Sequence, residues 1–201
     1  KLKPIDNYSL NLPIANFVYE AITQYFKVNK KLPGGVVIYR QGVSREQRSY
    51  LIPEINEVEN LMNGKSEEWT ILKDNPIPYY YILVNKKSSM KFFEQESNKN
   101  SVKFENPDPG LLICNGIVDT EYFEFYIQPQ KVKMGSASPT NFTVASGTMN
   151  CPELIMKLTY DLCYLYCNWR GPVRVPAPLK YAEKLAKISA NLNDKLKNYK
   201  S

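Results

Sequence analysis

Apolar residues near the start of the chain recur at the spacing of a helix. Ile14, Val18 and Ile22 lie four positions apart, and other apolar residues fill the three-residue steps between them. The pattern predicts an amphipathic helix that Pro33 and the following glycines separate from the next element. That element, residues 36–39, is a short β-branched run typical of a strand covered on both faces. A helix followed by a buried strand indicates an α/β architecture.

The pattern then predicts a helical crossover and a second strand. Ser44 and Gln47 fit a capping box, so we expect a helix to begin just after residues 42–43 and to run toward Pro53. A second helical piece carries Ile55, Val58, Leu61 and Met62, and the aromatic and β-branched run 79–84 predicts the strand.

The rest of the chain contains a polar loop, several strands and two helices. The loop is expected over residues 94–109, where polar and turn residues gather. Three strands in one sheet are then expected, followed by a helix after Pro152, a short strand and a last helix from about Leu179. The strand segments are 111–118, 122–127, 140–145 and 173–175.

Length and composition fit a globular chain. The 201 residues are 43% hydrophobic and 23% charged, which predicts one large domain or two small ones. No apolar run approaches the roughly 18 residues that span a bilayer, and the amino terminus carries no signal-peptide pattern. We therefore expect no membrane partner, and a chain that is a piece of a longer protein.

Charge and side-chain chemistry narrow the function. Residues 166–201 hold eight basic and two acidic side chains, which accounts for the net charge of +6. Such a stretch fits either a polyanion-binding surface or a solvated helix face. The absence of histidine excludes histidine bases, ligands and nucleophile pairs. Four cysteines without a C-x-x-C pair indicate reduced core thiols of a cytoplasmic or nuclear protein.

A series of motifs runs in order along the chain. The strongest reads Leu-Thr-Tyr-Asp-Leu-Cys-Tyr at 158–164 and continues into Asn-Trp-Arg-Gly-Pro-Val-Arg-Val-Pro-Ala-Pro at 168–178. Together the motifs resemble the PIWI domain of Argonaute proteins, and the last stretch resembles the Piwi clade. The other matching stretches are 37–44, 84–93, 106–110, 116–118, 123–126, 135–140 and 180–182.

The resemblance implies a fold and a boundary. The fold is an RNase H-like mixed sheet flanked by helices on both faces. Residues 1–201 would form the C-terminal two-thirds of one such domain, ending at or near the native C-terminus. Its first strands, with the first catalytic Asp, would precede Lys1.

The resemblance also implies that the cleavage site is degenerate. RNase H-type cleavage places two Mg²⁺ ions between carboxylates. The Asp that bridges these metals in the family corresponds to Gln41, whose amide oxygen brings no negative charge. The fourth catalytic group corresponds to Glu183, and an ungapped count places the family's Glu finger at Ser9, near Asp6. We assign no catalytic residue and no metal ligand.

Guide binding needs only cations, hydroxyls and main-chain N–H groups. Guide binding requires no cofactor. The resemblance allows a Mg²⁺ ion in the pocket that holds the guide 5′ phosphate. For each residue named next, the alternative is a solvent-exposed side chain that does not bind RNA. The residues expected beside the RNA are Lys86, Lys87, Lys91, Lys133, Arg174, Lys180, Tyr181 and Lys187.

Three hypotheses follow. The first is a binding module of a Piwi-like Argonaute that holds a small RNA guide and its paired target and acts in silencing or RNA processing without cutting. Its partners would be the N, PAZ and MID parts of the Argonaute or an accessory protein. The second is an active Mg²⁺-dependent endonuclease with rearranged ligands, such as Glu183 with Asp6. The third is a protein scaffold without bound RNA.

Overall fold

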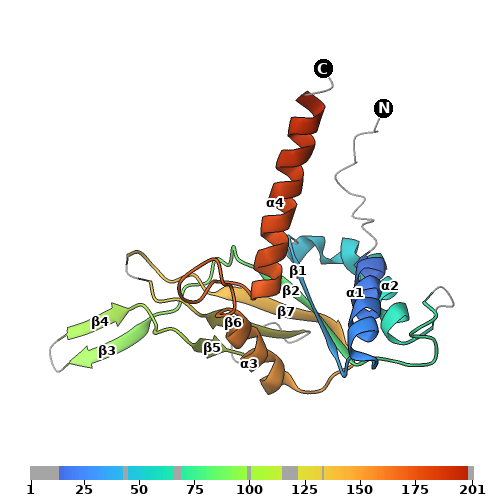
Figure 1. Cartoon of the computed structure of the whole chain (residues 1–201). Helices are drawn as coiled ribbons and strands as arrows, with labels where there is room; N and C mark the ends of the chain where they lie inside the picture. Colours follow the sequence, from blue (N-terminus) through green and yellow to red (C-terminus); the bar gives the residue numbers. More distant parts are fainter. Residues whose placement is uncertain are drawn as a thin grey trace. The chain divides into compact units, whose positions relative to one another are not determined.

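The structure is a computed structural model that describes residues 14–42, 45–65, 69–98, 101–114, 122–132 and 134–198. Figure 1 shows the helices and strands along the chain. The helical elements are α1 (Ile14–Asn29), the 3₁₀ helix η1 (Arg45–Leu51), α2 (Ile52–Met62), α3 (Pro152–Leu162) and α4 (Ala177–Asn198). The strands are β1 (Val36–Gln41), β2 (Tyr79–Asn85), β3 (Glu94–Asn98), β4 (Ser101–Glu105), β5 (Leu111–Ile113), β6 (Phe123–Gln128) and β7 (Thr140–Gly147).

Five of the strands form one mixed sheet, in the order β1-β2-β7-β6-β5. Helices flank this sheet, so the predicted fold class is confirmed. The chain separates into two compact units, and β1, β2 and β7 each contribute residues to both. No helix within the described ranges is long and apolar enough to cross a bilayer. That residues 1–201 are one portion of a single domain stays a prediction.

The first unit has a core made by α1, α2 and the first part of β2. Ile22 of α1, Val58 and Leu61 of α2 and Tyr81 of β2 are almost wholly inaccessible to solvent. The hydroxyl of Tyr81 donates to the buried carboxylate of Glu54, so this polar pair is satisfied inside the apolar core. The helical spacing therefore predicted α1 itself but only part of its buried face, because Ile14, Val18 and Ile22 pack inward whereas Phe17 is 62% exposed.

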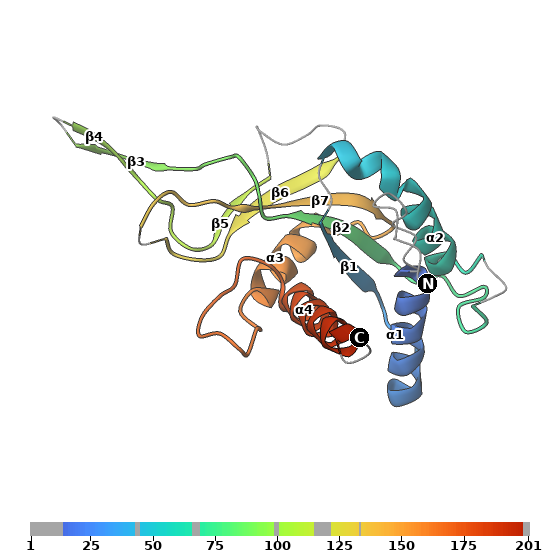
Figure 2. The same ribbon diagram turned by 90° about the horizontal axis from the view of Figure 1, so that it is seen from above.

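The second unit packs α3 beside β5 and β6. Phe125 of β6 and Phe142 of β7 stack with ring centroids 5.1 Å apart, and both rings are fully buried. On β7, Thr143 donates from Oγ1 to Oε1 of the buried Glu124 at 2.8 Å. Seen from above in Figure 2, β3 and β4 extend beyond the rest of this unit as a separate two-stranded sheet.

The hairpin corrects one prediction. Residues 94–109 were expected to form a loop because polar residues fill them, yet Glu94–Asn98 and Ser101–Glu105 pair antiparallel, with Gln95 opposite Phe104. Val102 and Phe104 lie on one face of β4 but are 59% and 65% exposed, so the hairpin forms by cross-strand pairing and not by burial of an apolar face.

Three further expectations differ from the structure. Residues 173–175 are not a strand, because the N–H of Val173 donates to the carbonyl of Cys163 at 2.8 Å instead of to a neighbouring strand. The helix expected after residues 42–43 begins as the 3₁₀ helix η1, and Ser44 of the predicted capping box lies outside the described residues. The four cysteines are free, but Cys163 alone is buried, since Cys167 is exposed and the other two are half-buried.

Candidate nucleic-acid interface

The carboxyl end of β2 and the first turns of α4 bring three charged side chains together. Lys86 follows β2 directly, and the buried Ala177 and Leu179 fix the start of α4. Pro178 suits the first turn of a helix, where its missing N–H removes no helical hydrogen bond. This arrangement places Lys180 and Glu183 one turn apart on α4.

The carboxylate of Glu183 is bound by two lysines. Nζ of Lys86 contacts Oε1 of Glu183, and Nζ of Lys180 lies 3.1 Å from Oε2. We call Lys86, Lys180 and Glu183 the lysine–glutamate cluster. The side chains of Lys86 and Glu183 are 29% and 19% exposed, so solvent still reaches the cluster. Two ammonium groups share one carboxylate, which leaves the cluster with a net positive charge.

The lysines also set the protonation of the carboxyl group. Burial raises the pKa of Glu183, but the hydrogen bonds and ion pairs with Lys86 and Lys180 lower it by more, and the net pKa lies below the ordinary value of 4.5. Glu183 is therefore a carboxylate at neutral pH.

Arg174 joins the cluster to the neighbouring loops. Its Nη2 donates to the carbonyl of Lys86 at 2.9 Å and to the carbonyl of Ser138 at 2.8 Å. Its own carbonyl accepts from Oγ1 of Thr140 at 2.8 Å. A guanidinium group has five N–H donors, so these two bonds from one nitrogen leave others to face a phosphate. Arg174 thus fixes the backbone around the cluster.

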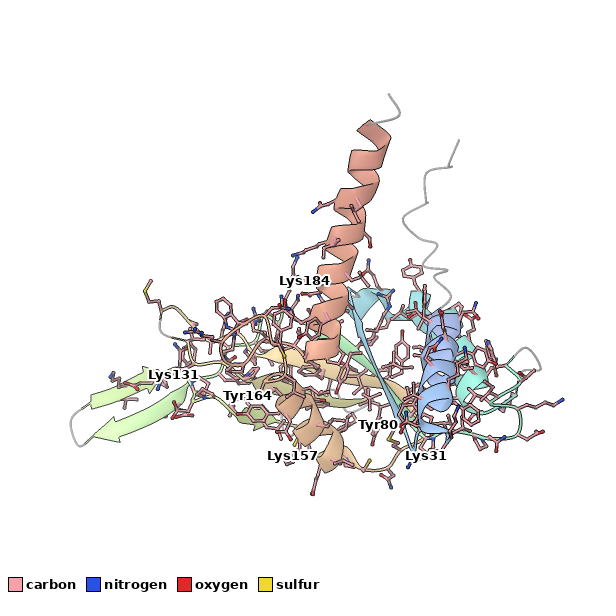
Figure 3. All side chains as sticks on the ribbon, in the orientation of Figure 1. Lys31, Tyr80, Lys131, Lys157, Tyr164 and Lys184 are labelled. Atoms are coloured by element: carbon pink, nitrogen blue, oxygen red, sulfur yellow. The ribbon has the colours of Figure 1, made fainter. Side chains whose placement is uncertain are left out.

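The other predicted contact residues that the structure describes lie on the surface. Lys87, Lys91 and Lys187 are exposed, and they make none of the contacts that join the cluster. Tyr181 is 40% exposed, accepts from the N–H of Cys167 at 3.1 Å and packs against Tyr166 with centroids 4.9 Å apart. Figure 3 shows Lys184 on the same helix, α4. Ser9 and Lys133 lie outside the described residues.

Gln41 ends β1 with a polar atom that lacks a partner. Its side-chain Oε1 is buried and accepts no hydrogen bond from the described residues, whereas its carbonyl accepts from Nη1 of Arg40 at 2.8 Å. An amide oxygen is a ligand for Mg²⁺, but it carries no charge to balance one. Gln41 therefore keeps a buried amide oxygen that has no donor among the described residues, at the position of the family's metal-bridging Asp.

The described residues do not fit the pair of Mg²⁺ ions that RNase H chemistry uses. Both oxygens of Glu183 already face ammonium groups, and Gln41 contributes no anion. Throughout the described ranges no three His, Cys, Asp or Glu side chains converge as a metal site. A divalent cation at Glu183 would have to displace two lysines of the same charge sign.

Two features of this surface were not predicted. One is the ion pair of Lys180 with Glu183, which the three-residue spacing within a helix could have predicted. Lys86 lies far away in the sequence, and no local pattern pairs it with Glu183. Trp169, which belongs to the motif at 168–178, lies outside the core, because its side chain is 64% exposed.

Comparison with known proteins identifies the relatives. Protein piwi of Drosophila melanogaster is 34% identical over 172 residues, which are 85% of this chain and 19% of that protein. Piwi-like protein 1 of Gallus gallus is 35% identical over 167 residues, covering 83% of this chain and 18% of that protein. The chain thus spans about a fifth of the length of these curated relatives.

Solved structures agree with this similarity. The crystal structure of Drosophila Piwi matches with a TM-score of 0.70 and 31% identity, over 87% of this chain and 23% of that one. The structure of Kluyveromyces polysporus Argonaute with a guide RNA matches with a TM-score of 0.71 at 22% identity, over 87% and 20% of the two chains. The second match supports the fold alone. The family model described as the Piwi domain covers residues 4–194, so this chain belongs to the Piwi domain family, as its motifs predicted.

Proposed function

We propose that this chain is the part of a Piwi-type Argonaute that holds a small RNA guide paired with its target, and that it does not cut the target. The observation that carries the proposal is the lysine–glutamate cluster. The position that matches a catalytic group of the family is occupied by a carboxylate whose two oxygens are bound by lysines. The cluster has cations for phosphates and no free anion for Mg²⁺.

The binding half of the proposal rests on charge and geometry. Lys86, Lys180 and Arg174 lie around one point, where the end of β2 meets the start of α4. Phosphate oxygens are bound by such groups without regard to base sequence. Exposed Lys87 and Lys91 follow Lys86 along the chain and extend the positive surface. The guide, the target and the remaining Argonaute domains are the partners we infer, in the cytoplasm or the nucleus.

RNA binding is tested on the full-length protein with a 5′-phosphorylated RNA as the probe. Lys87→Ala with Lys91→Ala leaves the lysine–glutamate cluster intact, and we expect weaker binding with a salt slope reduced by about 0.7 per lost contact. The matched control is Lys157→Ala on α3, whose Nζ already pairs with Asp161 at 2.7 Å. Equal affinities for wild type and both variants would contradict binding at this surface and favour a scaffold without RNA.

Cleavage is tested separately with a guide-loaded protein, a complementary target and Mg²⁺. We expect no product from the wild type. If the wild type makes a single cut opposite the guide centre and Gln41→Ala abolishes it, the protein is an active nuclease with rearranged ligands. That result would contradict the proposal that it does not cut the target. We also expect Gln41→Asp alone to give no cleavage, because Glu183 remains bound by Lys86 and Lys180.

A further inference from the structure

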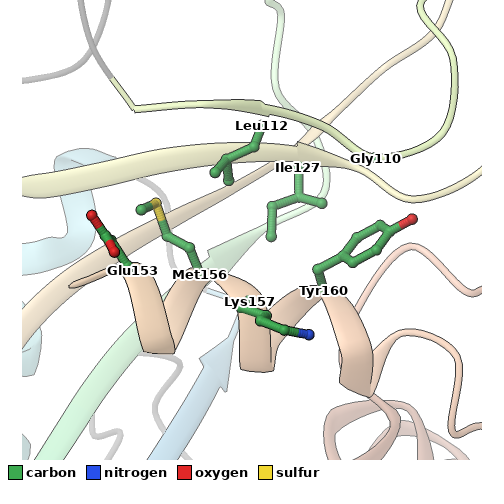
Figure 4. A pocket seen from close by; sticks show the side chains of 7 residues that line it. All are labelled: Gly110, Leu112, Ile127, Glu153, Met156, Lys157 and Tyr160. Carbon is green, nitrogen blue, oxygen red and sulfur yellow. The ribbon is translucent and has the colours of Figure 1, made fainter. Parts of the chain in front are cut away.

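A recess lies at the edge of the sheet beside α3. Its floor is apolar, with Ile127 of β6 and Met156 of α3, while Leu112 of β5 lies at the opening and Tyr160 forms one wall (Figure 4). The cavity has a volume of about 240 Å³. Ile127 and Met156 are almost fully buried, whereas Leu112 is 41% exposed, so the recess opens past Leu112.

Gly110 keeps this recess open. Its φ of +103° lies in the left-handed region, where a side chain is strained. A Cβ at this position would also approach the hydroxyl of Tyr160 to 3.4 Å. The N–H of Gly110 donates to the carbonyl of Gln128 at 2.8 Å, which fixes the turn into β5. The opening is therefore built into the backbone.

The strand beside the recess ends the sheet. β5 pairs with β6, with Leu112 opposite Ile127, and within the described ranges it has no strand on its other side. The N–H and C=O groups of an edge strand that face outward can pair with an added chain. An extended segment placed there would run beside Leu112, at the mouth of the recess.

The charges at the rim select the occupant. Nζ of Lys157 is paired with Oδ2 of Asp161 at 2.7 Å, and Glu153 adds a carboxylate to the rim. Asp161 does not line the recess but neutralises Lys157, so the carboxylate of Glu153 is the charge of the lining that attracts a basic side chain. A volume below the roughly 300–1,000 Å³ of small-molecule sites suits one large apolar side chain.

We propose that an extended segment of a partner protein pairs with β5, inserts one large apolar side chain between Leu112, Met156 and Tyr160, and places a basic residue opposite Glu153. Strand addition supplies main-chain hydrogen bonds, and the recess selects the side chain. This interaction does not depend on RNA binding, since none of its residues belongs to the lysine–glutamate cluster.

The test selects a phage-displayed library of random peptides on the full-length protein. We expect the enriched peptides to share one large apolar residue with Lys or Arg within two positions of it. For a synthetic enriched peptide, Leu112→Asp should weaken binding about tenfold or more, as for a central anchor contact. Glu153→Gln should weaken it about threefold, as for a rim charge.

The matched control is Leu154→Asp, which alters an exposed leucine of α3 that does not line the recess. We expect its affinity to stay within about twofold of the wild type. A second measurement needs no variant: the methyl resonance of Met156 should shift when the peptide saturates the protein. Enriched peptides without a shared apolar residue, equal losses in Leu112→Asp and Leu154→Asp, an unmoved Met156 resonance, or displacement of the peptide by RNA would each overturn the proposal.

Discussion

Glu183 shows how one residue can change what a site attracts. A free carboxylate at this position would draw divalent cations, but the two lysines supply its positive partners. Removing one partner of such a pair leaves the other charge uncompensated, so the three side chains stabilise one another as a unit. The protonation of Glu183 therefore reports on the state of the whole cluster.

The cluster predicts a dependence of stability on pH. Because the pKa of Glu183 in the fold lies below its ordinary 4.5, its contribution to stability is complete well above that pH and is lost as the pH falls through the folded pKa. Urea unfolding of the wild type and of Glu183→Gln should show a difference in unfolding free energy that shrinks on acidification. A difference that stays constant from neutral to acidic pH would mean that the ion pairs do not stabilise the fold.

The cysteines predict a pattern of chemical labelling. Burial raises the pKa of Cys163 to about 12, and its Sγ donates to the carbonyl of Thr159 at 3.3 Å. The reactive species is the thiolate, so the folded protein should resist iodoacetamide at Cys163 near about pH 8, while exposed Cys167 reacts. Peptide mass mapping checks this, with the denatured protein as the control in which both thiols are labelled. Labelling of Cys163 at the rate of Cys167 in the fold would contradict the burial.

At the scale of elements, the segment that leads into α4 is fixed mainly by side chains. It forms no strand, and the guanidinium of Arg174 instead holds the end of β2 and the loop before β7 through two carbonyls. Buried Val173 and Val175 lie on either side of it and anchor the same segment. Arg174 therefore connects this segment to two neighbouring segments through its side chain, without a strand ladder.

Arg174→Lys should destabilise the fold although the charge is kept. An ammonium on a flexible stem cannot reproduce the planar geometry of a guanidinium, and the loss of a hydrogen bond to a part-buried carbonyl costs about 0.5–1.5 kcal/mol. The midpoint of urea unfolding should fall while its slope stays unchanged. The matched control, Arg170→Lys, alters an exposed arginine and should change stability by less than about 0.5 kcal/mol. Equal stabilities of the two variants would contradict the role given to Arg174.

For the whole molecule, the distribution of charge matters more than its total. The net charge of +6 equals the excess carried by residues 166–201, and this stretch contains Arg174 and all of α4. The surface around Arg174 and the lysine–glutamate cluster is positive and suits phosphates. The recess beside α3 carries the carboxylate of Glu153 and suits a basic peptide.

Removing the carboxylate of the cluster should therefore strengthen RNA binding. In Glu183→Gln, Lys86 and Lys180 lose their shared anion, and one more cation becomes available to a phosphate. We expect tighter binding of a single-stranded guide at low salt, with a salt slope steeper by about 0.7. Titrations at several salt concentrations measure this, and an unchanged slope would show that the cluster does not meet the backbone of the RNA.

The sequence was most informative where burial imposes a pattern on one element. The four-residue spacing in α1 predicted the helix, and the continuous aromatic and β-branched run of β2 predicted a strand that is buried on both faces. The hairpin of β3 and β4 was missed, since its stability depends on cross-strand pairs that no local composition reports. The family positions of Gln41 and Glu183 came from motifs, whereas the contact of Lys86 with Glu183 depends on the fold.

The two carbonyls held by Arg174 have a consequence for the proposed binding of RNA, because they affect the entropy that binding would cost. A surface whose backbone is already locked loses little disorder when a strand arrives, so more of the attraction between cations and phosphates is retained as affinity. A guide that binds at this point would therefore adapt its own conformation to that of the protein backbone.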